Sequence, residues 1–349
     1  MKRFNLLAIV VMVALASASQ AQQYKVADLG TLGGSFSGAT AVSNRGVIAG
    51  FSTLSGDIQS NAVTWTKGSI TSLGTLGGNN STANGINASG FVVGSADLSD
   101  GVTTHAFLFT TTMNDLGSLA AGEGINSVAN GINRRGYVTG TSYLSDFLTQ
   151  HAFLWSPKTS TLTDLETLPG GTNSYGNAIN SSGTVVGASD TAPGGTDAAL
   201  WFVRKQGITV VDLGTLGGPT SQALAVNDEG LVVGSADTTT GTDAFLYAYG
   251  KMIDLGNLGG SSASANAING NGVVVGTSNT TGDADTHAFI WTWRKGLRDL
   301  NSLIPASSGW DLQTASSIDD QGRIVGTGIY NDPVNGPVTH AFVLTSRGD

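Results

Sequence analysis

The chain has 349 residues, with 25 acidic against 16 basic side chains and a formal net charge of −9 at pH 7. An acidic chain of this kind disfavours nucleic acid and anionic membrane surfaces as partners. There is no cysteine, so disulfide bonds cannot contribute to stability, and 50 glycines with 12% charged residues indicate many tight turns and short buried strands.

The N-terminal residues 1–21 have the layout of a secretory signal peptide. Lys2 and Arg3 precede an apolar run from Leu6 to Ala16, and small residues follow, with cleavage expected after Ala18 or Ala21. The apolar run is too short to cross a bilayer, and no later run is long enough. We therefore expect export to the extracellular space, the cell envelope or the periplasm, without a transmembrane anchor. Cleavage would remove Lys2 and Arg3 and change the net charge from −9 to −11.

One phrase recurs seven times in the remaining chain. It reads Asp-Leu-Gly-Thr-Leu-Gly-Gly, then Ala-Ile-Asn-x-x-Gly-x-Val-Val-Gly, then His-Ala-Phe-Leu-Trp. A repeat of 42 to 49 residues indicates a repeat architecture in which each copy is one supersecondary unit. The copies start at Asp28, Ser72, Asp115, Asp164, Asp212, Asp254 and Asp299.

Each copy contains four short strand patterns. In the second copy, residues 83–87 predict a first strand, and the Asn-Ala-Ser-Gly turn of residues 87–90 leads to a second at residues 91–94. A polar loop of residues 95–104 precedes a third strand at residues 105–109, and a fourth ends at residues 115–117. No window has apolar residues at helical spacing, so the sequence predicts an all-β fold.

The third strand is apolar on both faces, which indicates a sheet covered on both sides. Radial stacking of four-stranded sheets satisfies this requirement, and that arrangement is a β-propeller. A parallel β-helix is the alternative, but its repeat would be about half as long. We therefore predict one domain, residues 22–349, that folds as a seven-bladed β-propeller.

The two ends of the repeat complement each other. Residues 24–29 form a fourth strand with no preceding three, and residues 340–344 form a third strand with no following fourth. The N-terminal strand is therefore predicted to complete the last blade, which removes an exposed sheet edge.

Up-and-down connectivity separates the loops onto two faces. The fourth-to-first and second-to-third loops define the top face, and the Asn-x-x-Gly turns and third-to-fourth hairpins define the bottom face. Twelve basic residues belong to the bottom face, whereas the second-to-third loops have nine aspartates and no lysine or arginine. An acidic top face would attract cations or basic partners. Calcium suits clustered aspartates, so Asp97, Asp100, Asp283 and Asp285 are candidate metal ligands, although no loop matches a calcium consensus.

The four histidines occupy one position of the repeat, at the top end of the third strand. They are His105, His151, His287 and His340, and Asn61, Asp197 and Asp243 replace them in the other copies. Because any hydrogen-bonding side chain is accepted there, we expect a structural hydrogen bond in a turn or between blades. The aspartate of Asp-Leu-Gly receives the same structural interpretation, and no catalytic residue is assigned.

Residues that break the repeat are the better candidates for function. Glu123 and Glu166 fall in top loops of adjacent copies, Trp310 and Asp311 fall in an enlarged loop of the last copy, and Tyr175 has a similar place in its own copy. Carboxylates with aromatic neighbours can bind or hydrolyse a glycan. Drift in surface loops is the competing explanation.

The segments HAFLF, HAFLW, HAFIW and HAFVL, together with DLNSLIPASSGWDLQTASSIDDQGRIVGTG, resemble the HAF-repeat family of exported bacterial proteins. The resemblance covers residues 28–345. It implies an extracellular or envelope location and supplies no catalytic residue, since the family is known by its repeat and has no established activity. Three copies depart from the family pattern at the histidine and one at the leading aspartate.

Two functions compete. The first is a non-enzymatic binding or scaffold module that uses its acidic top face for a protein, a glycan or a cation. The alternative is a carbohydrate-active hydrolase or lyase on the same scaffold, because propellers host both. The sequence has no motif-grade catalytic set, which favours binding.

Overall fold

The computed structural model describes residues 23–122, 124–192 and 194–347. These residues form 28 β-strands and three short 3-10 helices, so the predicted all-β fold is confirmed. The predicted signal peptide, residues 1–21, lies outside the described residues. No helix within the described ranges has the length and apolarity needed to span a membrane.

The strands pair antiparallel in consecutive sets of four, which we number as groups. Group 1 is β2 (Gly33–Val42), β3 (Ile48–Leu54), β4 (Ser60–Thr66) and β5 (Ser69–Gly74). Group 2 is β6 (Gly77–Ile86), β7 (Val92–Leu98), β8 (Thr104–Phe109) and β9 (Met113–Gly117). Group 3 is β10 (Ser127–Ile132), β11 (Val138–Tyr143), β12 (Gln150–Ser156) and β13 (Thr161–Asp164). Group 4 is β14 (Ser174–Ile179), β15 (Thr184–Asp190), β16 (Thr196–Arg204) and β17 (Gly207–Asp212).

The remaining groups follow the same order. Group 5 is β18 (Ser221–Val226), β19 (Val232–Asp237), β20 (Thr242–Ala248) and β21 (Lys251–Gly256). Group 6 is β22 (Gly259–Ile268), β23 (Val274–Thr280), β24 (Thr286–Thr292) and β25 (Gly296–Asp299), with η1 (Thr281–Asp283) in its top loop. Group 7 is β26 (Trp310–Ile318), β27 (Ile324–Asp332) and β28 (Gly336–Ser346), preceded by η2 (Leu300–Leu303) and η3 (Ala306–Ser308).

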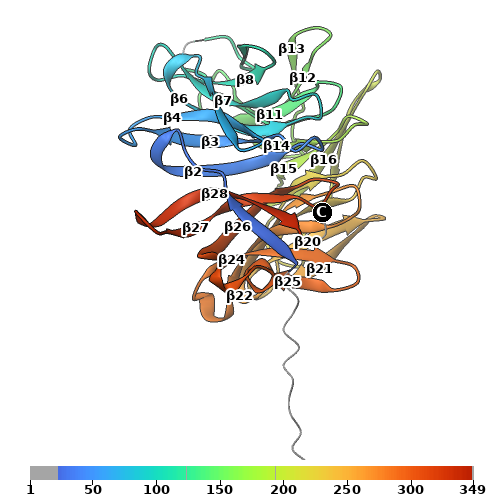
Figure 1. Ribbon diagram of the computed structural model, residues 1–349. Helices are drawn as coiled ribbons and strands as arrows, with labels where there is room; N and C mark the ends of the chain where they lie inside the picture. The colour runs from blue at the N-terminus through green and yellow to red at the C-terminus, as the bar shows by residue number, and fades with distance from the viewer. Residues whose placement is uncertain (1–22, 123, 193, 348–349) are drawn as a thin grey trace, which may run out of the picture.

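The fourth strand of group 7 is the first strand of the chain. β1 (Tyr24–Asp28) pairs antiparallel with β28, with Tyr24 opposite Ser346 and Asp28 opposite Phe342. Figure 1 shows the blue β1 strand lying against the red strands of the C-terminal end. Single parallel residue pairs also connect neighbouring groups, as Phe36 with Thr339 does between β2 and β28.

Several strands extend beyond the predicted limits. In group 2 the first strand begins at Gly77, inside the predicted Thr-Leu-Gly-Gly loop, and the second continues to Leu98. The extension arises because Gly77 pairs with Leu98, which carries the hairpin past the apolar core into polar residues. Asp97 therefore lies in a strand, where the sequence predicted a loop. Trp310, Asp311 and Tyr175 likewise belong to first strands and not to loops.

The core is divided into seven apolar clusters, each shared by two groups that are neighbours in the chain or at its ends. The cluster between groups 2 and 3, for example, combines Val93 and Ala106 with Ala129 and Phe153. The cluster between groups 7 and 1 combines Val325 and Ala341 with Ala39, Val63 and Trp65. Sheets apolar on both faces are thus buried against a neighbour on each side, as the sequence predicted.

The glycine of Val-Val-Gly has a steric role. β6 and β7 change register between Ala83 and Gly85, and this bulge brings the carbonyl oxygen of Thr82 against Gly94. A Cβ on Gly94 would overlap that oxygen. The same overlap would occur at the equivalent glycine of every group, so the repeat keeps a residue without a side chain there.

The asparagine of Ala-Ile-Asn connects one group to the next. Asn87 donates from Nδ2 to the Asn133 carbonyl at 3.1 Å, and Asn133 donates to the Asn180 carbonyl at 3.0 Å. The same bond continues from Asn180, Asn227 and Asn269 to the following groups. Ser43 and Asp319 stand in place of this asparagine in groups 1 and 7. Those two groups are joined by a different pair, in which Asn44 Nδ2 donates to Asp320 Oδ2 at 2.5 Å.

Candidate functional site

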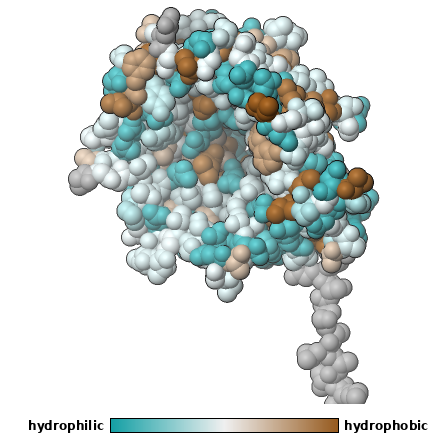
Figure 2. Space-filling view, turned by 90° about the vertical axis from the view of Figure 1, so that its left-hand side faces the viewer, coloured by the Kyte–Doolittle hydropathy of each residue, from teal (hydrophilic) through white to brown (hydrophobic). Residues whose placement is uncertain are grey.

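The top face is the side that bears the loops between the second and third strands of each group. Figure 2 looks onto the left-hand side of Figure 1, where the β27–β28 loop projects, and shows this face hollowed at its centre. Most of the candidate residues identified in the sequence lie on this face.

Three top loops are constructed around an aspartate. Asp100 Oδ1 accepts hydrogen bonds from the backbone amides of Val102 and Thr103 at 3.0 and 2.9 Å, and the Thr103 hydroxyl donates to Oδ2. Asp146 and Asp332 accept the same two backbone bonds in their loops. These bonds favour the charged carboxylate and lower the pKa of all three aspartates, with the Thr103 hydroxyl the largest cause at Asp100. The carboxylates therefore fix the conformation of their own loops.

Two further loops use an aspartate to hold the start of the first strand. Asp57 accepts from the Ser35 amide at 2.7 Å and from the Thr53 hydroxyl at 2.6 Å. Asp283 accepts from the Ser261 amide at 2.7 Å. The pKa of Asp57 is lowered, first by the Thr53 hydroxyl, and that of Asp283 is lowered, first by the Ser261 amide. Much of the acidity of the top face is thus engaged in hydrogen bonds within the protein.

Large apolar side chains stand at the tips of four of these loops and are 54% to 89% exposed. They are Ile58, Val102, Phe147, Leu148 and Val334, each one or two residues after an aspartate. Their loops belong to groups 7, 1, 2 and 3, which are consecutive neighbours. Among the described residues, the top loops of groups 4, 5 and 6 expose no large apolar side chain. We call this set the apolar crescent.

The apolar crescent was missed by the sequence interpretation, which sorted the loops by charge alone. The signal was present as Asp-Gly-Val, Asp-Phe-Leu and Asp-Pro-Val in three copies. A repeated apolar residue in a loop that has no core to enter is a surface feature, and it could have been recognised as one.

The candidate metal ligands have protein partners. Asp97 accepts from the amide and side chain of Asn80 and from the Thr104 hydroxyl at 3.0 to 3.1 Å, and Asp100 caps its own loop. Asp283 holds β22, while the backbone carbonyl of Asp285 accepts from the Thr280 amide at 2.8 Å. Within the described ranges, no group of three or more histidine or acidic side chains has an arrangement suited to a metal ion. Calcium binding stays a prediction.

The candidate ligand residues that the structure describes do not form one site. Glu123 lies outside the described residues. Glu166 is exposed, with its amide bonded to Asp164, whereas Tyr175 on β14 lines a separate cavity of about 410 Å³ between groups 4 and 5. Trp310 stacks on Tyr330 in group 7, with ring centroids 5.1 Å apart. The fold therefore distributes Glu166, Tyr175 and Trp310 around the top face.

Asp311 belongs to a small acid–base cluster. The Nδ1 of His287 lies 2.8 Å from Asp299, and its Nε2 lies 3.7 Å from Asp311, across the interface between groups 6 and 7. Burial raises the pKa of Asp311, assisted by the negative charges of Asp285 and Asp299 and opposed by His287. His287 thus has a carboxylate on each side, a contact that the sequence did not predict.

All four histidines bond to the aspartate near the end of the neighbouring fourth strand, which is Asp115, Asp164 or Asp299 later in the chain and Asp28 of β1 for His340. His105 Nδ1 lies 2.9 Å from Asp115 and donates to it, because a carboxylate only accepts. In group 1 the pair is replaced by Asn61 donating to Ser72 at 2.8 Å. The expected structural hydrogen bond is present, but it joins the third and fourth strands of one group instead of two blades.

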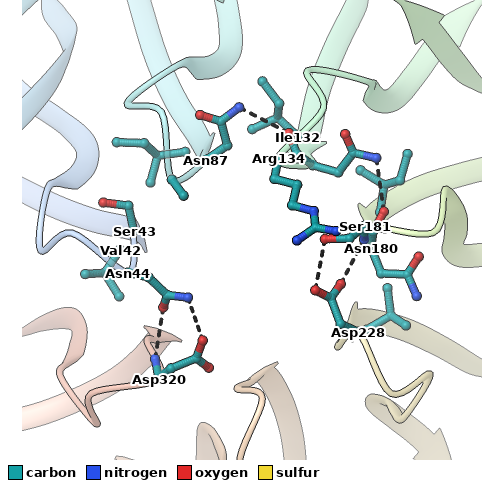
Figure 3. Close-up of a pocket in the computed structure, with 15 residues that line it drawn as sticks. Val42, Ser43, Asn44, Asn87, Ile132, Arg134, Asn180, Ser181, Asp228 and Asp320 are labelled. Carbon is teal, nitrogen blue, oxygen red and sulfur yellow. Dashed lines mark hydrogen bonds between the residues drawn. The ribbon is translucent and has the colours of Figure 1, made fainter.

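The bottom face has its own central cavity, of about 500 Å³, surrounded by the Ala-Ile-Asn turns. Figure 3 shows Asn44 paired with Asp320 on one side and Ser181 paired with Asp228 on the other. The carboxylates at this opening are therefore satisfied by neighbouring turns. Arg134 reaches into the same opening toward Ser181 (Figure 3).

Comparisons with known proteins bear on the fold. A family model described as a protein of unknown function (DUF3466) matches residues 220–348. No curated protein matches the sequence significantly. Among solved structures, the chain is similar to the β-propeller domain of the Trilobed protease from Pyrococcus furiosus, with a TM-score of 0.57 and 8% identity over 94% of this chain and 95% of that one.

Two further structures are similar over part of their length. TolB from Acinetobacter baumannii gives a TM-score of 0.50 and 12% identity over 74% of this chain, which spans 64% of TolB. A puromycin-hydrolyzing peptidase from Mycobacterium tuberculosis gives 0.53 and 12% over 82% of this chain, which spans 50% of the peptidase. At these identities the likeness shows the fold alone. The protein is an all-β chain with a β-propeller fold built from four-stranded sheets.

Proposed function

We propose that the seven groups are seven blades of a closed propeller, with β1 as the fourth strand of the last blade. The support comes from contacts between the ends of the chain. β1 pairs with β28 over five residues, and an apolar cluster containing Val325 and Val63 lies between groups 7 and 1. The Asn44–Asp320 pair and a bond from the Ala341 amide to Ser37 Oγ join the same two groups.

We further propose that this propeller is an exported, non-enzymatic module that binds a protein partner through the apolar crescent of its top face. The observation that carries the proposal is that each exposed apolar tip follows an aspartate whose hydrogen bonds order its loop. Ordering a loop in advance lowers the entropic cost of binding. Apolar side chains held in water on ordered loops are typical of an interaction surface.

Charge adds to this surface. The top loops contain aspartates and no basic residue, so their field favours a partner with a basic rim around an apolar centre. The predicted export and the HAF-repeat resemblance are consistent with a partner in the cell envelope or outside the cell. The alternative of a carbohydrate-active hydrolase or lyase rests on Glu123 and Glu166 and stays a prediction.

The test uses two crescent residues that are exposed and make no core contact. The chain lacking residues 1–21 is immobilised, and binding of envelope proteins and of a polysaccharide panel is compared with that of a Val102→Ser, Leu148→Ser double variant. We expect the double variant to bind the partner protein at least tenfold more weakly than the unchanged chain does, because both apolar side chains are removed from the interface.

The matched control is Tyr249→Ser, which removes a 98% exposed aromatic from a bottom-face hairpin. The control should bind as the unchanged protein does. Equal binding by the double variant, or loss with the control alone, contradicts the proposed use of the top face. A polysaccharide whose binding is lost with Val102 and Leu148 contradicts the choice of a protein partner for the apolar crescent.

A further inference from the structure

A second cavity, of about 480 Å³, opens on the bottom face between group 6 and group 7, where β1 begins. Its walls come from the β24–β25 turn, from the Asn-x-x-Gly turns of both groups and from Tyr24. The position lies on the opposite side of the disc from the apolar crescent. Any ligand of this cavity is therefore distinct from the partner proposed above.

The charge of this cavity is opposite to that of the chain. Arg294, Lys295 and Arg298 line it, and no aspartate or glutamate does, although the whole chain has a net charge of −9. In the described part of the protein, none of the three basic side chains has a carboxylate within ion-pair distance. The Nε of Arg298 is buried and has no hydrogen-bond partner there. An unpaired buried donor is costly and calls for an acceptor.

Aromatic rings form another part of the wall. Trp293 is 59% exposed and rests edge-on against Trp291, with centroids 4.9 Å apart, so most of its surface is free. Tyr24 lines the same cavity and is partly buried. Burial raises the pKa of the Tyr24 hydroxyl, and the positive charge of Arg298 acts against that rise, which places the two groups within electrostatic reach.

The equivalent position between groups 3 and 4 has a smaller cavity, of about 240 Å³. It is lined by a single basic residue, Arg135, which lies over the Tyr137 ring at 5.8 Å and is thereby occupied. The larger cavity lies beside the start of β1, where group 7 has no third-to-fourth hairpin because its fourth strand is β1. Its three basic residues and exposed tryptophan are specific to this junction.

We propose that this cavity binds an acidic oligosaccharide of the uronic acid type. The exposed face of Trp293 suits the apolar face of a sugar ring, and the three basic side chains suit carboxylates on successive rings. Thr292 adds a hydroxyl for hydrogen bonding at the edge of the cavity. Several charges spaced along one ligand match several cations better than a single small anion does.

The experiment titrates the chain lacking residues 1–21 with trigalacturonate and measures binding by calorimetry and by tryptophan fluorescence. Trigalacturonate should bind and shift the emission, because Trp293 is the most exposed tryptophan among the large exposed side chains. A neutral galactose trisaccharide should bind at least tenfold more weakly. Raising the salt concentration should weaken the acidic ligand only.

Variants assign the binding to this cavity. Arg294→Gln with Lys295→Gln should weaken trigalacturonate at least tenfold without lowering the melting temperature, since both side chains are exposed. Lys251→Gln, which removes a basic residue from the hairpin of group 5 and does not line the cavity, should leave affinity unchanged. Val102→Ser with Leu148→Ser should also bind normally, so that the two proposals are separated.

Three results would overturn the proposal. Equal affinity for the acidic and neutral trisaccharides would show that the three basic side chains do not contribute to binding. Equal affinity of the Arg294→Gln, Lys295→Gln variant and the unchanged chain would show that the ligand binds elsewhere. Binding of benzoate or sulfate as strongly as trigalacturonate shows that the saccharide contributes nothing.

Discussion

The top and bottom faces of the disc have opposite charge, and they use it differently. On the top face, Asp100 and Asp146 accept hydrogen bonds from their own loops. On the bottom face, Arg294 and Lys295 extend beside a cavity without a described carboxylate partner. The difference teaches that a count of charges does not give the charge available to a ligand. The acidic face also presents apolar tips that a count of charges does not reveal, whereas Arg294 and Lys295 have no carboxylate partner among the described residues.

The largest expected effect comes from removing β1, which tests whether the two faces belong to one closed disc. Deleting residues 23–28 exposes the edge of β28 and removes Tyr24 and Val26 from the last apolar cluster. Full burial of such a side chain contributes roughly 1.5–3 kcal/mol, and both are only partly buried, so a loss of about 3 kcal/mol in unfolding free energy is expected. Denaturant unfolding should show a lower midpoint, and hydrogen exchange should show a loss of protection in all seven groups. An unchanged midpoint rules out the closure.

A smaller and local effect is expected for Asp146→Ala, which tests whether a carboxylate of the top face orders its own loop. Loss of the bonds to the Leu148 and Thr149 amides should release residues 146–149, seen as faster hydrogen exchange and protease cleavage there. The melting temperature should change little. Lys251→Ala on the bottom face is the comparison, and it should alter neither measurement. Unchanged exchange in the Asp146 variant would mean that the carboxylate does not order its loop.

Some of this contrast could be predicted from the sequence and some could not. The strands, the turns and the propeller fold follow from a repeat that is visible along the chain. The partners of Asp100 and Asp57 do not follow, because each depends on where a loop folds back. The cavity beside Arg298 depends on residues 23–24 meeting residues 271–322, a contact that no local pattern encodes. The asparagines of Ala-Ile-Asn were explained as turn residues, although their side chains also bond the next group.

A third test concerns the histidine–aspartate bonds at the top edge. The hydrogen bond to Asp115 raises the pKa of His105, so the folded state holds the proton more tightly than the unfolded state. This stabilisation is complete below the unfolded pKa of about 6.5 and is lost as the pH rises through the folded value. Between pH 5.5 and 8.5 the protein should lose up to about 1 kcal/mol relative to His105→Asn. In an Asp115→Asn background this difference should disappear, and its persistence would assign it to another group.

The smallest effect is expected from calcium. A bound ion would have to compete with the amide and hydroxyl groups that already donate hydrogen bonds to the carboxylates of Asp97, Asp100 and Asp283. Melting in millimolar calcium and in chelator should therefore differ by less than about 1 °C, since stabilisation grows with the ratio of ligand concentration to Kd. A melting temperature several degrees higher in calcium would show that carboxylates of the top face are available to a ligand and would weaken the contrast between the faces.

The chain of asparagine side chains has an evolutionary consequence. Groups 3 to 6 each contribute one donor to the following neighbour and one acceptor to the preceding neighbour, so a duplicated copy of this kind would enter the gene with both partners supplied. Ser43 and Asp319 lack the amide side chain of the other copies, and between groups 7 and 1 their neighbours Asn44 and Asp320 bond to each other instead. A copy inserted among groups 3 to 6 would therefore keep this bond on both sides, whereas groups 1 and 7 depend on a contact that only the two of them share.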